Sequence, residues 1–167
     1  MIPRMQSLVE RMQRERPLLL AAVREVADEQ ATLERPGENY SVREILAHLA
    51  GAERGMTRMA QLAAADKNPR LPQGYVNDEY NARQQEKRKD KSVSELISEL
   101  SESRQQLLAF METVREEDLA KPAEHPIIGN TDVWGVLNIL IEHEREHAQQ
   151  LSEWVAELKK SQDRRKA

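Results

Sequence analysis

The chain has 167 residues, a length that fits one domain with a single hydrophobic core. Hydrophobic residues make up 39%, charged residues 32% and aromatic residues 4% of the chain, a balance that favours amphipathic helices over β-sheets. The net charge of −4 mixes both signs along the chain without a basic patch, so we expect no nucleic-acid partner.

The chain contains no cysteine, which excludes disulfides, thiolate metal sites and a cysteine nucleophile. Residues 1–4 lead into no apolar run, so the sequence predicts no signal peptide. No stretch approaches the ~18 apolar residues that a membrane-spanning helix needs. We therefore expect a cytoplasmic protein without a membrane partner.

The first predicted helix covers residues 5–26, where apolar residues recur at helical spacing. Pro17 lies inside this segment, and we expect it to kink the helix or to start a second one. The sequence Arg35-Pro36-Gly37 then ends the segment, because proline and glycine interrupt regular structure.

The second predicted helix begins at Ser41, which forms a capping box with Glu44, and its apolar stripe continues to Ala63. Residues 66–91 are polar and contain prolines, which predicts a crossover connection with a short helix at residues 78–89. A connection of this length is uncommon inside a compact domain. The second and third long helices are therefore not expected to be simple hairpin neighbours.

The third predicted helix begins at Ser92, with Glu95 completing another capping box, and its stripe ends at Val114. A proline-containing loop follows. Asn130 or Thr131 is expected to cap the fourth helix. The pattern therefore predicts four long amphipathic helices and no strand.

The predicted fold class is all-α, a four-helix bundle that forms a single domain over residues 1–160. Residues 161–167 are expected to form a polar C-terminal tail, whose basic side chains complement the negative end of the last helix. We find no internal repeat in the chain.

Two histidines interrupt the apolar stripe of the fourth helix. His143 and His147 stand where the pattern requires buried apolar groups, and the stripe resumes at Leu151. They lie one turn apart, about 6 Å along the axis, so both imidazoles can face one centre. His48 lies roughly 60° from the centre of the stripe of the second helix and can also face the interior.

Three inward imidazoles favour a divalent metal ion that keeps a fourth position open for water or substrate. Each histidine alone is more simply interpreted as a hydrogen-bonded core residue, and a bundle without metal remains an alternative. His125 stands in the predicted loop, where a solvent-exposed side chain is expected. The metal hypothesis therefore rests on the three histidines together.

Residues 143–147 also match the His-Glu-x-x-His motif of zinc proteases and its inverted form. No further histidine follows His147 and no sheet is expected, so we disfavour a protease. Glu144 is predicted either to accept a proton at the metal or to be a surface charge paired one turn away. Glu53, at the edge of its stripe, is a candidate for supporting a metal ligand.

Three stretches resemble the DinB/YfiT-like superfamily of metal-dependent enzymes. Residues 40–49 resemble the Trp-Ser-x-x-(Glu/Asp)-x-Leu-x-His-Leu opening of its second helix, although Tyr40 replaces the usual Trp. Residues 142–151 resemble its closing His-x-x-x-His-x-x-Gln segment, with Gln149 where many relatives have Gly. Residues 77–104 resemble the connector and third helix of one branch. The similarity covers nearly the whole chain.

The resemblance implies an up-down-down-up bundle with a long crossover between helices 2 and 3. It also implies that the metal triad of the family falls on His48, His143 and His147. Zinc or nickel is the usual metal in relatives, and homodimers are common. Characterised members include transferases and isomerases that depend on low-molecular-weight thiols.

We therefore expect a metal-dependent enzyme, either a thiol-dependent S-transferase or a hydrolase, that acts on a small molecule. Because the chain has no cysteine, any thiol would come from a cosubstrate. The alternative is a non-catalytic bundle that binds a metal or a ligand, since a fold does not fix a function.

Overall fold

The computed structural model describes the backbone of residues 1–38 and 40–166 and the side chains of these residues as far as residue 161. Its elements in chain order are α1 (Pro3–Val23), α2 (Asp28–Ala31), α3 (Val42–Ala64), α4 (Asn77–Glu86), α5 (Val93–Thr113), the 3-10 turn η1 (Glu116–Asp118), β1 (Pro122–His125), β2 (Gly129–Asp132) and α6 (Val133–Lys166). None of the described helices is long and apolar enough to cross a membrane.

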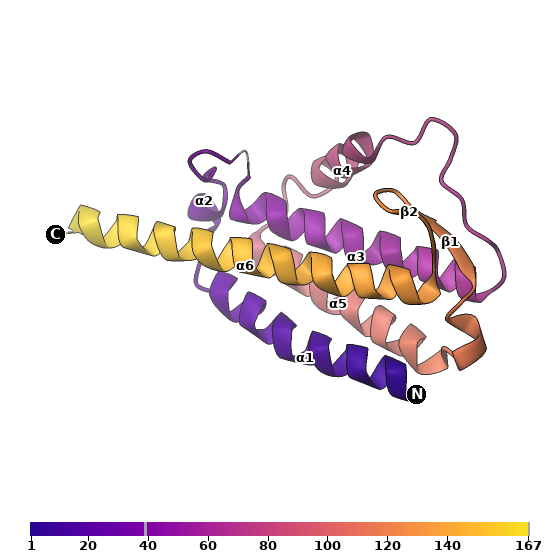
Figure 1. Cartoon of the computed structure of the whole chain (residues 1–167). Helices are drawn as coiled ribbons and strands as arrows, with labels where there is room; N and C mark the ends of the chain where they lie inside the picture. Colours follow the sequence, from indigo (N-terminus) through magenta and orange to yellow (C-terminus); the bar gives the residue numbers. More distant parts are fainter. Residues whose placement is uncertain (39, 167) are drawn as a thin grey trace.

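The long helices α1, α3, α5 and α6 form an up-down-down-up bundle, which confirms the predicted fold class (Figure 1). Helices α3 and α5 run in the same direction, because the chain between them returns along the length of the bundle (Figure 1). Helix α4 lies within this crossover and packs against α3. The short helix expected at residues 78–89 is therefore present, with slightly different bounds.

Both predicted capping boxes are confirmed. The Ser41 hydroxyl accepts a hydrogen bond from the backbone N–H of Glu44 at 3.2 Å, and the Glu44 carboxylate accepts one from the backbone N–H of Ser41 at 2.8 Å. Ser92 and Glu95 make the same pair of bonds at the start of α5. These bonds satisfy N–H groups that have no partner within the helix, so each helix begins directly after its serine.

Three local predictions differ from the structure. Helix α1 continues through Pro17, so no second helix begins there. The predicted loop after η1 instead forms an antiparallel hairpin, in which Pro122 pairs with Asp132. Asn130 and Thr131 lie in β2, and the cap of α6 is Asp132, whose carboxylate accepts from the backbone N–H of Gly135 at 2.7 Å. The strands are short and polar, so the sequence carries no alternating apolar pattern that would predict them.

Helix α6 also continues beyond the predicted domain end. Its last residue is Lys166, so most of the segment expected as a tail at residues 161–167 is helical.

The hydrophobic core consists of two clusters, one toward each end of the bundle. On each long helix, a charged residue separates the two clusters. These residues are Arg16 of α1, Glu53 of α3, Arg104 of α5 and Glu144 of α6. A polar layer therefore crosses the middle of the bundle, and the predicted histidines lie beside it.

Candidate metal centre

The structure brings together the three histidines that the sequence pattern singled out. His48 projects from α3, and His143 and His147 project from α6, so two helices adjacent in the bundle supply all three rings. One ring nitrogen from each histidine lies within 4.8 Å of the other two. The Nε2 atoms of His48 and His143 are 2.9 Å apart, and the ring centroids are 4.6 to 4.9 Å apart.

These residues fit a divalent metal ion. Two ligand nitrogens of a tetrahedral zinc site are about 3.3 Å apart. The His48 and His143 nitrogens are 2.9 Å apart, and all three ligand nitrogens lie within 4.8 Å of one another, so small movements of the rings would suffice to coordinate one ion. Each imidazole is half-buried, and among the residues that the structure describes no carboxylate shares the cluster. A three-nitrogen set of this kind suits zinc or nickel and leaves a position open to a further molecule.

The environment of the cluster keeps two of its rings neutral. Burial, together with the nearby imidazole of His147, lowers the pKa of His48 to about 4. Burial and the neighbouring rings lower the pKa of His143 to about 3. A histidine coordinates metal in its neutral form, because the proton and the metal compete for the same lone pair. At neutral pH both rings are therefore ready to coordinate.

His147 is held in place by the glutamine of the family-like closing segment. The Nδ1 atom of His147 lies 2.9 Å from Oε1 of Gln150, and Gln150 donates from Nε2 to the Glu38 carboxylate at 2.9 Å. A bond at Nδ1 leaves Nε2 of His147 as the nitrogen that can coordinate a metal. Metal-binding histidines commonly have such a partner, because it fixes the orientation of the ring.

The lowered pKa values predict a specific pH dependence for the metal-free protein. The unfolded chain has histidines of ordinary pKa near 6.5 and binds protons first as the pH falls, so stability is full above pH 6.5 and decreases below it. Between pH 7 and pH 5 we expect a loss of about 2 kcal/mol in unfolding free energy for each of His48 and His143. Urea unfolding in the presence of a chelator at pH 7 and pH 5 measures this loss of unfolding free energy.

The double variant His48→Gln, His143→Gln is the control and should lose much less unfolding free energy over the same pH range. Equal losses in both proteins would show that these two histidines do not cause the pH dependence.

A cavity of about 300 Å³ adjoins the histidine cluster, with His48 and His143 in its wall. The cavity lies between α3, α6, the β1–β2 hairpin and the crossover that contains α4. Most of its lining is apolar, including Ala52, Met56, Met59, Leu71, Ile127 and Ile139. A cavity of this size and character suits a small molecule that carries an apolar part.

The expectation for His125 is wrong. Its side chain is only 2% exposed and belongs to the wall of this cavity, because strand β1 turns it inward. The Nδ1 atom accepts a hydrogen bond from the backbone N–H of Ile127 at 3.3 Å, while Nε2 is buried without a partner among the described residues. Burial lowers the pKa of His125, which keeps the ring neutral. Nothing in the local sequence identified this position, because the hairpin itself was not predicted.

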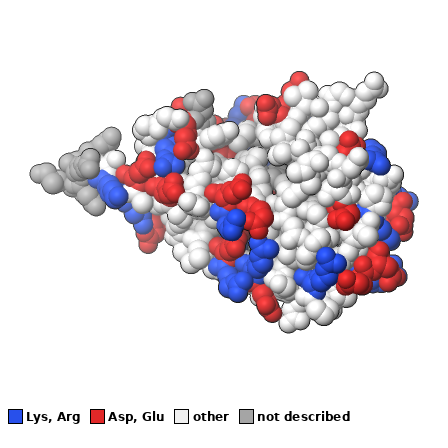
Figure 2. All heavy atoms as spheres, viewed as in Figure 1, with Lys and Arg blue, Asp and Glu red and all other residues white. Residues whose placement is uncertain are grey.

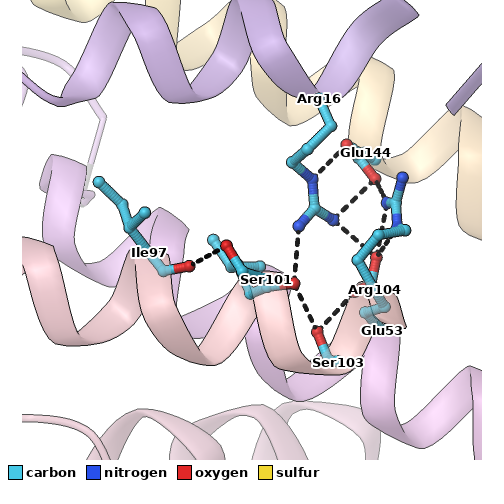
Figure 3. Close-up of polar contacts among 8 residues, drawn as sticks. Arg16, Glu53, Ile97, Ser101, Ser103, Arg104 and Glu144 are labelled. Atoms are coloured by element: carbon cyan, nitrogen blue, oxygen red, sulfur yellow. Dashed lines mark hydrogen bonds and ion pairs between the residues drawn. The ribbon is translucent and has the colours of Figure 1, made fainter. Parts of the chain in front are cut away.

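Glu144 does not lie on the surface, so the interpretation as an exposed paired charge is also wrong. Its side chain is 4% exposed and binds the guanidinium groups of Arg16 and Arg104. Burial acts to raise the pKa of Glu144, but the hydrogen bonds and charges of the two arginines outweigh it and hold the pKa below its usual range. Figure 3 shows both arginines between the carboxylates of Glu144 and Glu53.

The fold and the histidine cluster together place the protein among four-helix bundles in which side chains from facing helices form a candidate metal site. The family model of the DinB superfamily matches residues 11–151. The chain therefore belongs to the DinB superfamily, which confirms the resemblance drawn from its motifs. None of the curated proteins matches the sequence.

Several solved structures share the fold at low sequence identity. YfiT from Bacillus subtilis, described as a probable metal-dependent hydrolase with an unusual four-helix bundle topology, has 18% identity and a TM-score of 0.76, covering 92% of this chain and 87% of its own. DfsB, a sibling lethal factor precursor, has 19% identity and a TM-score of 0.75, covering 97% of this chain and 98% of its own. ClbS, a colibactin self-resistance protein solved in complex with double-stranded DNA, has 18% identity and a TM-score of 0.70, covering 92% of this chain and 96% of its own.

Proposed function

We propose that the protein is a metal-dependent enzyme that acts on a small molecule, with His48, His143 and His147 as the metal ligands. The convergence of three imidazoles, two of which lie in the wall of an apolar cavity, carries this proposal. Zinc or nickel is the metal we expect, because both bind neutral imidazole well. The description of YfiT as a probable metal-dependent hydrolase supports the same chemistry.

The reaction class we favour is thiol-dependent transfer or hydrolysis. When bound, the cation would supply positive charge that favours the deprotonated form of a thiol or water beside it. The chain has no cysteine, so a thiol would be a cosubstrate. Met56, Met59 and Ile139 would pack against the apolar part of the second substrate and exclude water from it.

The cavity also has polar groups that can orient a substrate. The hydroxyl of Tyr80 lies close to Gly55 of α3. A Cβ atom added at Gly55 would be only 2.8 Å from the Tyr80 oxygen, so a larger residue there would collide with the hydroxyl. Tyr75 donates to the Asn77 side chain at 3.3 Å. These groups come from the crossover, which gives the long connection between α3 and α5 a role in holding the substrate.

Glu144 as a proton acceptor stays a prediction. Its ion pairs with Arg16 and Arg104 favour the ionised form but also occupy its oxygens, so a role in positioning the site agrees better with these contacts. The alternative to an enzyme remains a non-catalytic bundle that binds a metal or sequesters a ligand in the cavity.

The remaining predictions concern partners and organisation. We expect a homodimer, a cytoplasmic location, a single domain over residues 1–160 and no nucleic-acid partner. On the face seen in Figure 2, basic and acidic side chains are interspersed, which offers no continuous basic surface to a phosphate backbone. Because ClbS was solved with double-stranded DNA, a salt-dependent DNA-binding assay is the direct check.

A screen for metal-dependent activity tests the proposed function. The protein is stripped of metal and reloaded with one equivalent of zinc or nickel. Thiol transfer is assayed with several low-molecular-weight thiols and an electrophile such as a haloaromatic compound. Hydrolysis is assayed separately with small esters and amides. We expect a rate that requires both metal and protein. A variant Gly55→Val, which narrows the cavity without changing a ligand, should keep the metal and lose most of this rate. Stoichiometric metal without any metal-dependent rate would favour the non-catalytic bundle.

A further inference from the structure

A buried network of four charged residues lies beside the histidine cluster and joins the four long helices. Each helix contributes one member, and the charges balance as two arginines and two glutamates (Figure 3). The members, all between 4% and 8% exposed, are Arg16, Glu53, Arg104 and Glu144. Ser103 adds a hydrogen bond to the Glu53 carboxylate at 2.5 Å.

The network is closely connected. Arg16 donates to Glu144 at 2.7 Å and to Glu53 at 2.6 Å, and Arg104 donates to Glu53 at 2.6 Å and also pairs with Glu144. A buried ion pair contributes little net stability compared with apolar residues of similar size, because each charge loses its hydration. Net stabilisation therefore does not account for four charged residues in the middle of an apolar core, which favours a functional role.

A small cavity connects this network to the candidate metal centre. It has a volume of about 10 Å³, and its polar lining is formed by Arg16, Glu53, Glu144 and His143. A space of about 10–15 Å³ with two or more polar partners is sufficient for one buried water. Both glutamates of the network and a metal-ligand histidine therefore line the same small cavity.

The two nitrogens of His143 face different surroundings. Its Nε2 faces His48, and its Nδ1 forms no hydrogen bond to any residue that the structure describes. When Nε2 is a metal ligand, Nδ1 carries the proton and requires an acceptor, which is normally a carboxylate, a carbonyl or a water. For His147 that partner is Gln150.

We propose that Glu53 and Glu144 position His143 for metal binding, through one water in the small cavity that accepts from Nδ1–H and donates to their carboxylates. Arg16 and Arg104 bind both carboxylates and fix them in place. The ligands from α6 are then oriented in two ways, His147 by a direct amide contact and His143 by the buried charge network. This proposal rests on the metal site of the proposed function and adds the residues that set its affinity.

The variants Glu53→Gln and Glu144→Gln test this proposal, because glutamine keeps the shape and removes the charge. Glu99→Gln is the matched control, since Glu99 is a 5% exposed carboxylate held by Arg88 and Lys91 away from the histidines. Zinc affinity is measured at pH 7 by competition with a chromogenic chelator. We expect about 10- to 100-fold weaker binding in the first two variants, and a change below about threefold in Glu99→Gln.

The thermal stability of each metal-free variant separates affinity from folding. If all three variants lose similar stability and keep the affinity of the original protein, the network is only structural and the proposal is overturned. A second measurement needs no variant. In the zinc-loaded original protein, nitrogen-15 NMR of the histidine rings should show a protonated Nδ1 on His143, and an unprotonated Nδ1 would overturn the proposal.

These experiments distinguish failure of the proposed positioning of His143 from failure of the proposed enzymatic function. If the original protein binds no zinc, the metal site and this inference both fail. If zinc binds with the expected differences among variants but no reaction is found, the positioning of His143 stands and only the enzymatic activity is rejected.

Discussion

Replacing His143 with alanine is expected to weaken zinc binding by at least ~100-fold and to abolish stoichiometric metal in the purified protein. The reason is geometric, because His143 is the ring that lies 2.9 Å from His48 and within one helical turn of His147. The two remaining rings cannot complete a three-ligand set, and loss of a direct ligand costs more than the 10- to 100-fold typical of residues behind it. Metal analysis after gel filtration and chelator competition measure both effects.

His125→Asn is the matched control for this experiment. His125 lies in the same cavity wall and is buried, but its ring nitrogens do not belong to the cluster. Asparagine can keep an acceptor for the backbone N–H of Ile127, so this variant should fold and bind zinc with the original affinity. Unchanged metal content in His143→Ala, or equal loss in both variants, would show that the three histidines are not the metal site.

Replacing Arg16 with methionine is expected to destabilise the protein by about 3–5 kcal/mol. Methionine fills similar space but leaves Glu144 and Glu53 with one guanidinium instead of two, and both carboxylates are 4% exposed. A buried charge that loses its partner retains the cost of dehydration without the compensating attraction. The free energy from urea unfolding at pH 7 measures the loss.

Arg11→Met on the same helix provides the comparison. Arg11 pairs with Glu142, but both side chains are partly exposed, so its loss should cost less than about 1 kcal/mol. A double variant, Arg16→Met with Glu144→Gln, should recover part of the stability, because it removes one of the unpaired charges. If Arg16→Met costs no more than Arg11→Met, the network does not contribute a coupled buried charge and this account of the core is wrong.

The helices and the histidines were predictable because their signals are local. Helical spacing of apolar residues and the capping boxes at Ser41 and Ser92 depend only on neighbours within one or two turns, and the structure contains both. His143 and His147 were found because they interrupt a regular stripe on one helix. The third partner, His48, required only that its own helix face the same interior.

The hairpin and the surroundings of His125 and Glu144 were not predictable in this way. Strands β1 and β2 are four residues each and carry no alternating pattern, so their pairing depends on how α3 and α6 hold them. His125 was expected in solvent and is buried only because this hairpin closes over the cavity. Glu144 has the spacing of a surface residue in a glutamate-rich helix, and its burial depends on the arginines of α1 and α5.

The sequence by itself therefore determined four amphipathic helices, the starting residues of α3 and α5 and three inward histidines, because periodicity and capping act along a single segment. The tertiary structure decided which charges are buried, which cavity adjoins the histidines and which residues support them. These depend on side chains that four separate helices and a hairpin bring together, as Arg16, Glu53, Arg104 and Glu144 do in the middle of the core. Polar groups can be buried only where another segment supplies a partner, and no single stretch of sequence contains that information.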